Sequence, residues 1–94
     1  METARVINPS DVRLYYFGSK DVLQTEDERK QRKHKLERAM TLTHELQQQI
    51  NFRIQLPTGE ILETQSGLLD YTEGFVVMRG GYVVPIGAII DVEM

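Results

Sequence analysis

The spacing of apolar residues along this chain changes near residue 50 and divides it into a helical part and a β-rich part. In the helical part, apolar or small side chains recur at intervals of three and four, which makes one face of a helix: Leu36, Ala39, Thr43 and Leu46. Thr25 and Glu28 have the spacing of a capping box, which favours a helix start at this point. We predict an amphipathic helix over residues 25–49, with its carboxyl half packed on the protein and its amino half in water.

From residue 50 onward, short apolar runs alternate with turn residues. Phe52, Ile54 and Leu56 are separated by polar residues, which is the period of a half-buried strand. Residues 57–59, 70–74 and 80–81 are rich in the glycine, proline and aspartate typical of turns. We predict five short strands, the second bent at Gly67, because an isolated strand glycine favours a bulge or bend.

These patterns predict an α+β, mainly β fold, in which the helix packs on a five-stranded antiparallel SH3-like or Sm-like barrel. Closing the sheet would hide most of its strand edges. The expected core of this barrel consists of alternate strand residues: Phe52, Ile54, Leu56, Phe75, Val77, Val84, Ile86, Ile90 and Val92. With 94 residues, the chain fits a single domain made of an irregular segment (1–24), a helix (25–49) and a barrel (50–94).

The segment 1–24 has no sustained period, although residues 12–16 alternate like a short strand. Three neighbouring aromatic residues follow the start of this alternation: Tyr15, Tyr16 and Phe17. One interpretation is that they cover an edge or open end of the barrel. The other is that they form a partner-binding patch, since exposed aromatic clusters favour interfaces.

Charge is distributed unevenly along the chain, whose formal net charge is −3. The β-rich part carries six acids against two arginines, a net charge of −4, which is unfavourable for binding phosphate backbones. The amino half of the helix is rich in basic residues, and four of them are candidates for contact with a nucleic acid or an acidic protein: Arg29, Lys30, Arg32 and Lys33. Acids lie among them, so a solvated and self-paired helix surface is the alternative.

Several functions are disfavoured by residues that the sequence lacks or separates. Without cysteine there are no disulfides, thiolate nucleophiles or cysteine-based zinc sites. His34 and His44, the only histidines, fall roughly on opposed helical faces and do not converge on a metal. No serine, histidine and acid have a recognisable nucleophile arrangement. We expect neither an enzyme nor a bound cofactor or metal.

The chain is also expected to be cytoplasmic and to contact no membrane. No apolar run approaches the roughly 18 residues that a membrane helix needs. The first five residues lack the basic-then-apolar layout of a signal peptide.

From Leu42 onward the sequence resembles the YolD-like family of small bacterial proteins. The likeness is carried by Leu42 and Leu46, Ile54 and Gly59, residues 67–69, Gly80-Gly81, residues 84–86 and, above all, residues 89–93 (Ile-Ile-Asp-Val-Glu). The resemblance implies an Sm-like barrel that serves as an accessory or regulatory subunit of an error-prone DNA polymerase in damage tolerance. It makes Tyr15, Tyr16 and Phe17 the candidate docking residues, although the family usually has a tryptophan in this region.

Together these observations predict a non-enzymatic adaptor or regulator that binds another protein. Two alternatives remain: an Sm-like RNA-binding protein, and a barrel that inhibits a nucleic-acid-handling protein as the Rof family does. One continuous acidic face would favour a protein target, whereas acids scattered among basic loops would leave RNA open. A homodimer is compatible with all three.

Overall fold

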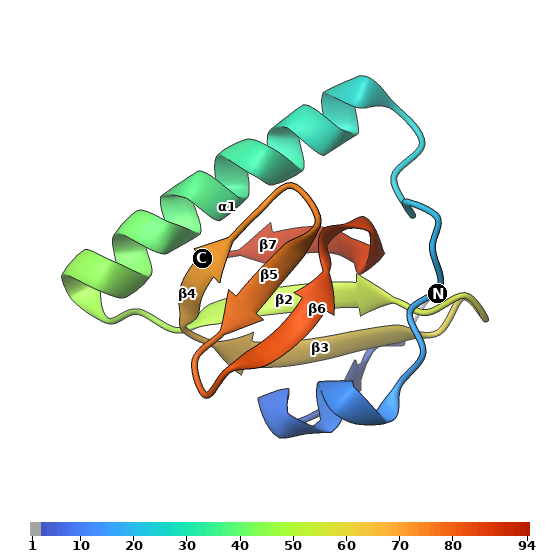
Figure 1. Ribbon diagram of the computed structural model, residues 1–94, viewed down its shortest axis with the longest axis horizontal. Helices are drawn as coiled ribbons and strands as arrows, with labels where there is room; N and C mark the ends of the chain where they lie inside the picture. The colour runs from blue at the N-terminus through green and yellow to red at the C-terminus, as the bar shows by residue number, and fades with distance from the viewer. Residues whose placement is uncertain (1–2) are drawn as a thin grey trace.

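The computed structural model describes residues 3–94 and has, within them, one α-helix, two short 3-10 helices and seven strands (Figure 1). In chain order the elements are β1 (Arg5–Val6), η1 (Pro9–Leu14), α1 (Glu26–Leu46), β2 (Ile50–Gln55), β3 (Ile61–Ser66), β4 (Leu68–Tyr71), β5 (Phe75–Met78), β6 (Tyr82–Pro85), η2 (Ile86–Ala88) and β7 (Ile89–Glu93). The predicted α+β, mainly β class is confirmed.

The strands form two sheets, with the orders β1-β3-β2-β7 and β4-β5-β6, and neither closes into a barrel. The prediction of a closed five-stranded barrel is therefore wrong. The second predicted strand is divided at Gly67 into β3 and β4, and Arg5–Val6 adds a parallel strand beside β3. A Cβ atom at Gly67 would lie 2.9 Å from the guanidinium carbon of Arg79, so the end of the Arg79 side chain packs over the glycine at this bend.

The two helical elements complete the core from different sides of the sheets. α1 lies against β4 and β7, while η1 lies against β6 and β3 on the opposite side (Figure 1). Leu36 and Ala39 of α1 and Val12 of η1 are buried in the same cluster as the inward residues of the strands. The helix thus packs on the sheets as predicted, because its buried stripe supplies apolar area that both sheets need.

The predicted core is correct in β2 and wrong by one residue in two other strands. Phe52, Ile54, Leu56, Val84 and Val92 are buried as expected. In β5, however, Val76 and Met78 are buried, whereas Phe75 and Val77 face outward. β5 is apolar at four successive positions, so its sequence does not mark which face is inner.

In β7, Ile89 is buried together with Val92, whereas Ile90 is only partly buried. Ile54 of β2 pairs with Ile89, and the neighbouring Arg53 pairs with Asp91, so Ile90 is an extra residue in a bulge. Because of this extra residue, Ile89 and Val92 both face the core although they are three positions apart, and the simple alternation from Val92 back to Ile90 does not hold. Ile86, the remaining predicted core residue, is half-buried in η2 at the edge of the core cluster.

The helix begins as predicted and ends earlier. The Thr25 hydroxyl accepts from the Glu28 N–H at 3.2 Å, and the Glu28 carboxylate accepts from the Thr25 N–H, so the capping box is confirmed. Gln47 in the left-handed conformation terminates α1. Leu46 was predicted on the buried face and is 68% exposed. Arg32 was predicted on a solvated surface and is only 6% exposed. One side of the amino half of α1, at Arg32, is therefore packed against the protein, while the other residues of 26–34 are exposed as predicted.

The segment 12–16 is not a strand. Val12 and Leu14 belong to the 3-10 helix η1, which begins at Pro9, and the Asn8 carbonyl accepts from the Asp11 N–H at 2.9 Å. Proline at the first position favours this turn because its φ is already fixed in the helical range. Val12 alone of the segment is fully buried.

Candidate functional site

The outer face of the β4-β5-β6 sheet carries a group of apolar side chains that nothing in the described chain covers. Phe75 lies opposite Pro85, and Val77 lies opposite Val83, in the pairing of β5 with β6. Phe75 is 50% exposed, Val83 49% and Leu69, at the bulge of β4, 39%. We call this group the apolar face, and it consists of Leu69, Phe75, Val77, Val83 and Pro85.

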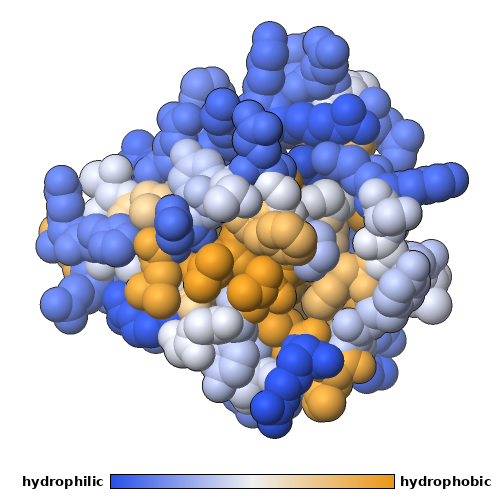
Figure 2. Space-filling view, viewed as in Figure 1, coloured by the Kyte–Doolittle hydropathy of each residue, from blue (hydrophilic) through white to orange (hydrophobic). Residues whose placement is uncertain are grey.

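Figure 2 shows apolar surface gathered over the middle of the molecule, where β5 and β6 lie in Figure 1. A solvated sheet face normally alternates apolar inward residues with polar outward ones. A contiguous apolar patch on the outside is typical of an interaction site.

The outer face of the other sheet is charged and internally paired. Arg53 in β2 lies between Glu63 of β3 and Asp91 of β7 in the strand register, and its Nε is 3.1 Å from the Glu63 carboxylate. The Lys35 ammonium of α1 contacts the Asp91 carboxylate. These four residues form a row of alternating charge across the sheet, which we call the charge row.

The acids of the β-rich part do not form a free acidic surface. Three of the six are in ion pairs: Glu63 and Asp91 in the charge row, and Glu60, whose carboxylate lies 3.4 Å from Arg5. The pattern is thus of acids distributed among basic partners. Half of these acids are therefore paired with basic side chains, which counts against one continuous acidic face formed by all six.

The predicted aromatic residues divide into two structural and one exposed side chain. Tyr15 and Phe17 are half-buried and pack against the core cluster. Tyr16 is 78% exposed. With Phe17 it lines a surface hollow of about 400 Å³ that continues to Pro57. Tyr16 is therefore the aromatic residue of this segment that a partner can reach.

The predicted basic residues of α1 also have different environments. The Arg32 guanidinium donates to both carboxylate oxygens of Asp21, at 2.9 and 2.6 Å, and to the Ile89 carbonyl at 3.0 Å. Arg29 donates to the Leu23 carbonyl at 3.1 Å and lies 3.5 Å from Asp21. Both arginines thus fix the segment before α1, which is a structural role.

Asp21 responds electrostatically to this arrangement. Partial burial acts to raise the pKa of its carboxyl, but hydrogen bonds from Arg32 and the Leu23 N–H, with the charges of Arg32 and Arg29, lower the pKa below its usual value. The carboxylate is therefore ionised at neutral pH and serves as the anionic partner of Arg32. The backbone at Asp21 lies close to η2. A Cβ atom at Gly87 of η2 would lie 3.3 Å from the Asp21 Cα, so the two segments are in tight contact.

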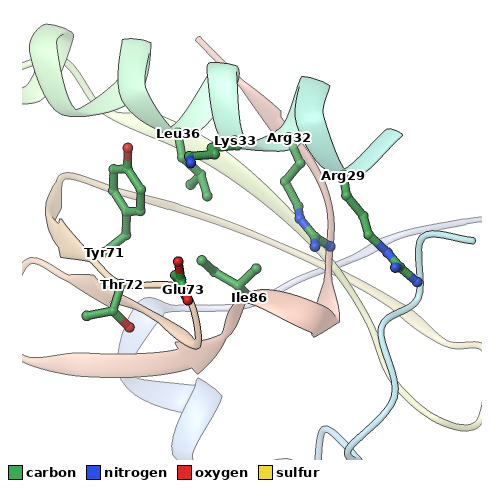
Figure 3. A pocket seen from close by; sticks show the side chains of 8 residues that line it. All are labelled: Arg29, Arg32, Lys33, Leu36, Tyr71, Thr72, Glu73 and Ile86. Atoms are coloured by element: carbon green, nitrogen blue, oxygen red, sulfur yellow. The ribbon is translucent and has the colours of Figure 1, made fainter. Parts of the chain in front are cut away.

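Lys30 and Lys33 are exposed, and Lys33 lines a cavity of about 280 Å³ between α1 and the β4–β5 turn (Figure 3). Arg29 and Arg32 line the same cavity from the helix, so the structure brings three of the four predicted basic residues together. The aromatic segment lies at a separate hollow. The two predicted groups do not form one site.

The two histidines lie apart on exposed positions of α1. His34 is 3.9 Å from Glu37, and the His44 Nε2 is 3.1 Å from the Leu69 carbonyl oxygen. Within residues 3–94, no three histidine or acidic side chains are grouped to hold a metal ion. Over the same residues, α1 is too polar to be a membrane-spanning helix.

Comparisons of the chain with family models, curated proteins and solved structures found no match. We therefore infer the candidate site from the arrangement of its residues alone. The apolar face was missed because Phe75 and Val77 were assigned to the core. The signal that could have revealed it is the run of successive apolar residues in β5 and β6, which predicts apolar side chains on both faces of these strands.

Proposed function

We propose that this protein is a non-enzymatic adaptor or regulator that binds another protein through the apolar face of the β4-β5-β6 sheet. The observation that carries the proposal is that Phe75 and Val83 are exposed on the same sheet face as Val77. The outer face of the other sheet, in contrast, carries charged residues that form ion pairs with one another. Burying such a patch against a partner removes apolar area from water, which contributes roughly 25 cal/mol for each Å². Tyr16 is a further contact candidate on a separate surface.

A narrower proposal is that the partner is an error-prone DNA polymerase of damage tolerance and that the protein acts in the cytoplasm. Its support is the resemblance of residues 42–94 to the YolD-like family. The strand arrangement is compatible with an opened Sm-like barrel, because β3 continues into β4 across Gly67 and only three residues of η2 link β6 to β7.

The proposal is tested by affinity capture of the tagged full chain from its native cytoplasm, with and without nuclease. The variant is Phe75→Asp/Val83→Asp, which places two carboxylates on the apolar face. The matched control is Gln49→Asp/Gln65→Asp, which adds the same charge at two exposed positions outside the apolar face and outside the hollow at Tyr16. Tyr16→Ala is tested alone, because Tyr15 and Phe17 pack against the core and their removal would destabilise the fold.

We expect a nuclease-resistant protein partner that is retained by the control variant and lost from Phe75→Asp/Val83→Asp. Circular dichroism of both variants shows whether each is folded. Recovery of RNA or DNA, with no protein surviving nuclease, would overturn the proposal and favour the Sm-like RNA-binding alternative. A captured protein whose nucleic-acid binding is inhibited would instead favour the Rof-like mode of action.

A further inference from the structure

The cavity between α1 and the β4–β5 turn has an apolar floor and a charged rim. Its floor includes Leu36, which is almost fully buried, and Ile86 of η2. Tyr71, at the end of β4, extends toward α1, Glu73 lines the cavity from the β4–β5 turn, and the arginines and Lys33 extend from the helix (Figure 3). Its volume of about 280 Å³ is sufficient for one large side chain of a partner and not for a drug-sized molecule.

The charges around this cavity are unequal. Asp21 holds both Arg32 and Arg29, and Glu73 is the one acid among the lining residues. The lining residues counted with Asp21 carry one more positive charge than negative, while Glu37 and Asp70 add negative charge beside Tyr71, away from the lining. Of the three cations that line the cavity, Lys33 is the one without an ion-pair partner among the described residues.

Tyr71 adds a hydrogen-bond donor to this rim. Burial, together with the charges of Glu37 and Asp70, raises the pKa of its hydroxyl above the usual value. The hydroxyl therefore stays protonated at neutral pH and can donate to an oxygen acceptor. Lys33 and Tyr71 together provide donors suited to a carboxylate next to an apolar floor.

The cavity is continuous with the apolar face. A second hollow, of about 410 Å³, shares Arg32, Glu73 and Ile86 with it and extends to Phe75 and Pro85. Lys20 lines this second hollow and adds another cation. Phe75 and the cavity are therefore connected through lining residues that the two hollows share.

We infer that the cavity binds an extended peptide segment of the partner that carries an acidic side chain beside an apolar one. The apolar side chain enters over Leu36 and Ile86, the carboxylate pairs with Lys33, and the rest of the segment lies on the apolar face. This inference rests on the proposed function, because it specifies the chemistry of the partner at the same surface. The charge complementarity contributes specificity, since a basic segment would meet the excess positive charge.

The test is a selection of random dodecapeptides displayed on phage against the full-length protein, followed by fluorescence anisotropy of the enriched peptides. The variants are Lys33→Glu and Lys33→Gln, and the matched control is Lys30→Glu, which makes the same change three residues earlier on the exposed surface of α1. We expect the enriched peptides to carry Asp or Glu next to a large apolar residue. Their Kd should rise about tenfold in Lys33→Glu, less in Lys33→Gln, and remain unchanged in Lys30→Glu.

Three results of the peptide selection and binding measurements would overturn the inference. These are enrichment of peptides without acids, equal binding by wild type and Lys33→Glu, and the absence of any peptide that binds with a Kd below about 100 µM. Displacement of the peptides by a single-stranded RNA that binds at Lys33 would also overturn it, in favour of a nucleic-acid site. The capture experiment with Phe75→Asp/Val83→Asp is independent of Lys33, so the proposed function can hold when this inference fails.

Discussion

The two sheets of this protein differ most in what their outer faces carry. On the β1-β3-β2-β7 sheet, Arg53, Glu63 and Asp91 lie in register and are joined to α1 by Lys35. On the β4-β5-β6 sheet, Phe75, Val77 and Val83 occupy the equivalent outward positions and are partly exposed. The first face satisfies its side chains within the molecule. The second presents an apolar surface that the rest of the described chain leaves uncovered, and this difference is why we propose that face as the binding surface.

The strongest test of this comparison substitutes neighbouring residues on opposite faces of the same strands. Val76→Asp places a carboxylate in the core, where Val76 is fully buried, and should cost more than about 4 kcal/mol and unfold the domain. Val83→Asp, on the apolar face, should change the free energy of unfolding by less than about 1 kcal/mol. Urea denaturation followed by circular dichroism measures both. Similar losses for the two variants would mean that the apolar face is part of the core.

The next effect concerns the ion pair that attaches α1 beside the charged sheet. Asp21→Asn leaves Arg32 buried without its anionic partner and should cost roughly 3 kcal/mol at pH 7. Because the folded-state pKa of Asp21 is lowered, its contribution is present above the usual pKa of 3.8 and is lost as pH falls through the lower folded value. Urea midpoints of wild type and Asp21→Asn should therefore converge as the pH is lowered from 7 toward 2. A difference that is independent of pH would contradict this account.

The charge row should have a smaller effect, because its members are partly exposed. In a double-mutant cycle with Arg53→Ala and Glu63→Ala, the coupling free energy should be about 0.5 kcal/mol and should decrease in 1 M salt. The Arg53 Nε has no well-aligned hydrogen bond among the described residues, so the pair acts through charge. A coupling above about 2 kcal/mol would show that the row is a major support of its sheet.

The smallest effect on stability is expected from polar substitutions that keep the shape of the apolar face. Val77→Thr/Val83→Thr should change the free energy of unfolding by about 0.5 kcal/mol or less, since threonine is also favourable in strands. The same variant should bind less of the dye ANS, whose fluorescence reports exposed apolar surface. Unchanged dye binding would show that these valines are not the exposed apolar surface of the protein.

The sequence predicted those features of the fold that local patterns specify. Thr25 and Glu28 indicated the start of α1, and the glycines at 80 and 81 indicated the β5–β6 turn, where both have positive φ values of 97° and 86°. The strands beyond residue 50 were also indicated, apart from their number. Each of these depends on residues close together in the chain.

The errors arose where distant residues decide the structure. Ile90 was assigned to the core because a simple alternation with Val92 was assumed, and the bulge opposite Arg53 depends on pairing with β2. Arg32 has the sequence environment of a solvated helix, and its partner Asp21 lies in an irregular segment without any pattern. The apolar face was hidden because Phe75 and Val77 are as apolar as the buried residues beside them.

The bonds of Arg32 have a consequence for how the molecule opens. One guanidinium joins three segments that are far apart in the chain: the loop at Asp21, the helix and the first residue of β7. Detaching any one of these segments would leave the buried guanidinium of Arg32 without one of its hydrogen-bonding partners. The three segments should therefore open together as one cooperative unit. The amide of Val22, which donates to the Gly87 carbonyl at 2.8 Å, should then exchange its hydrogen as slowly as amides in the carboxyl-terminal strand, although it lies in a loop.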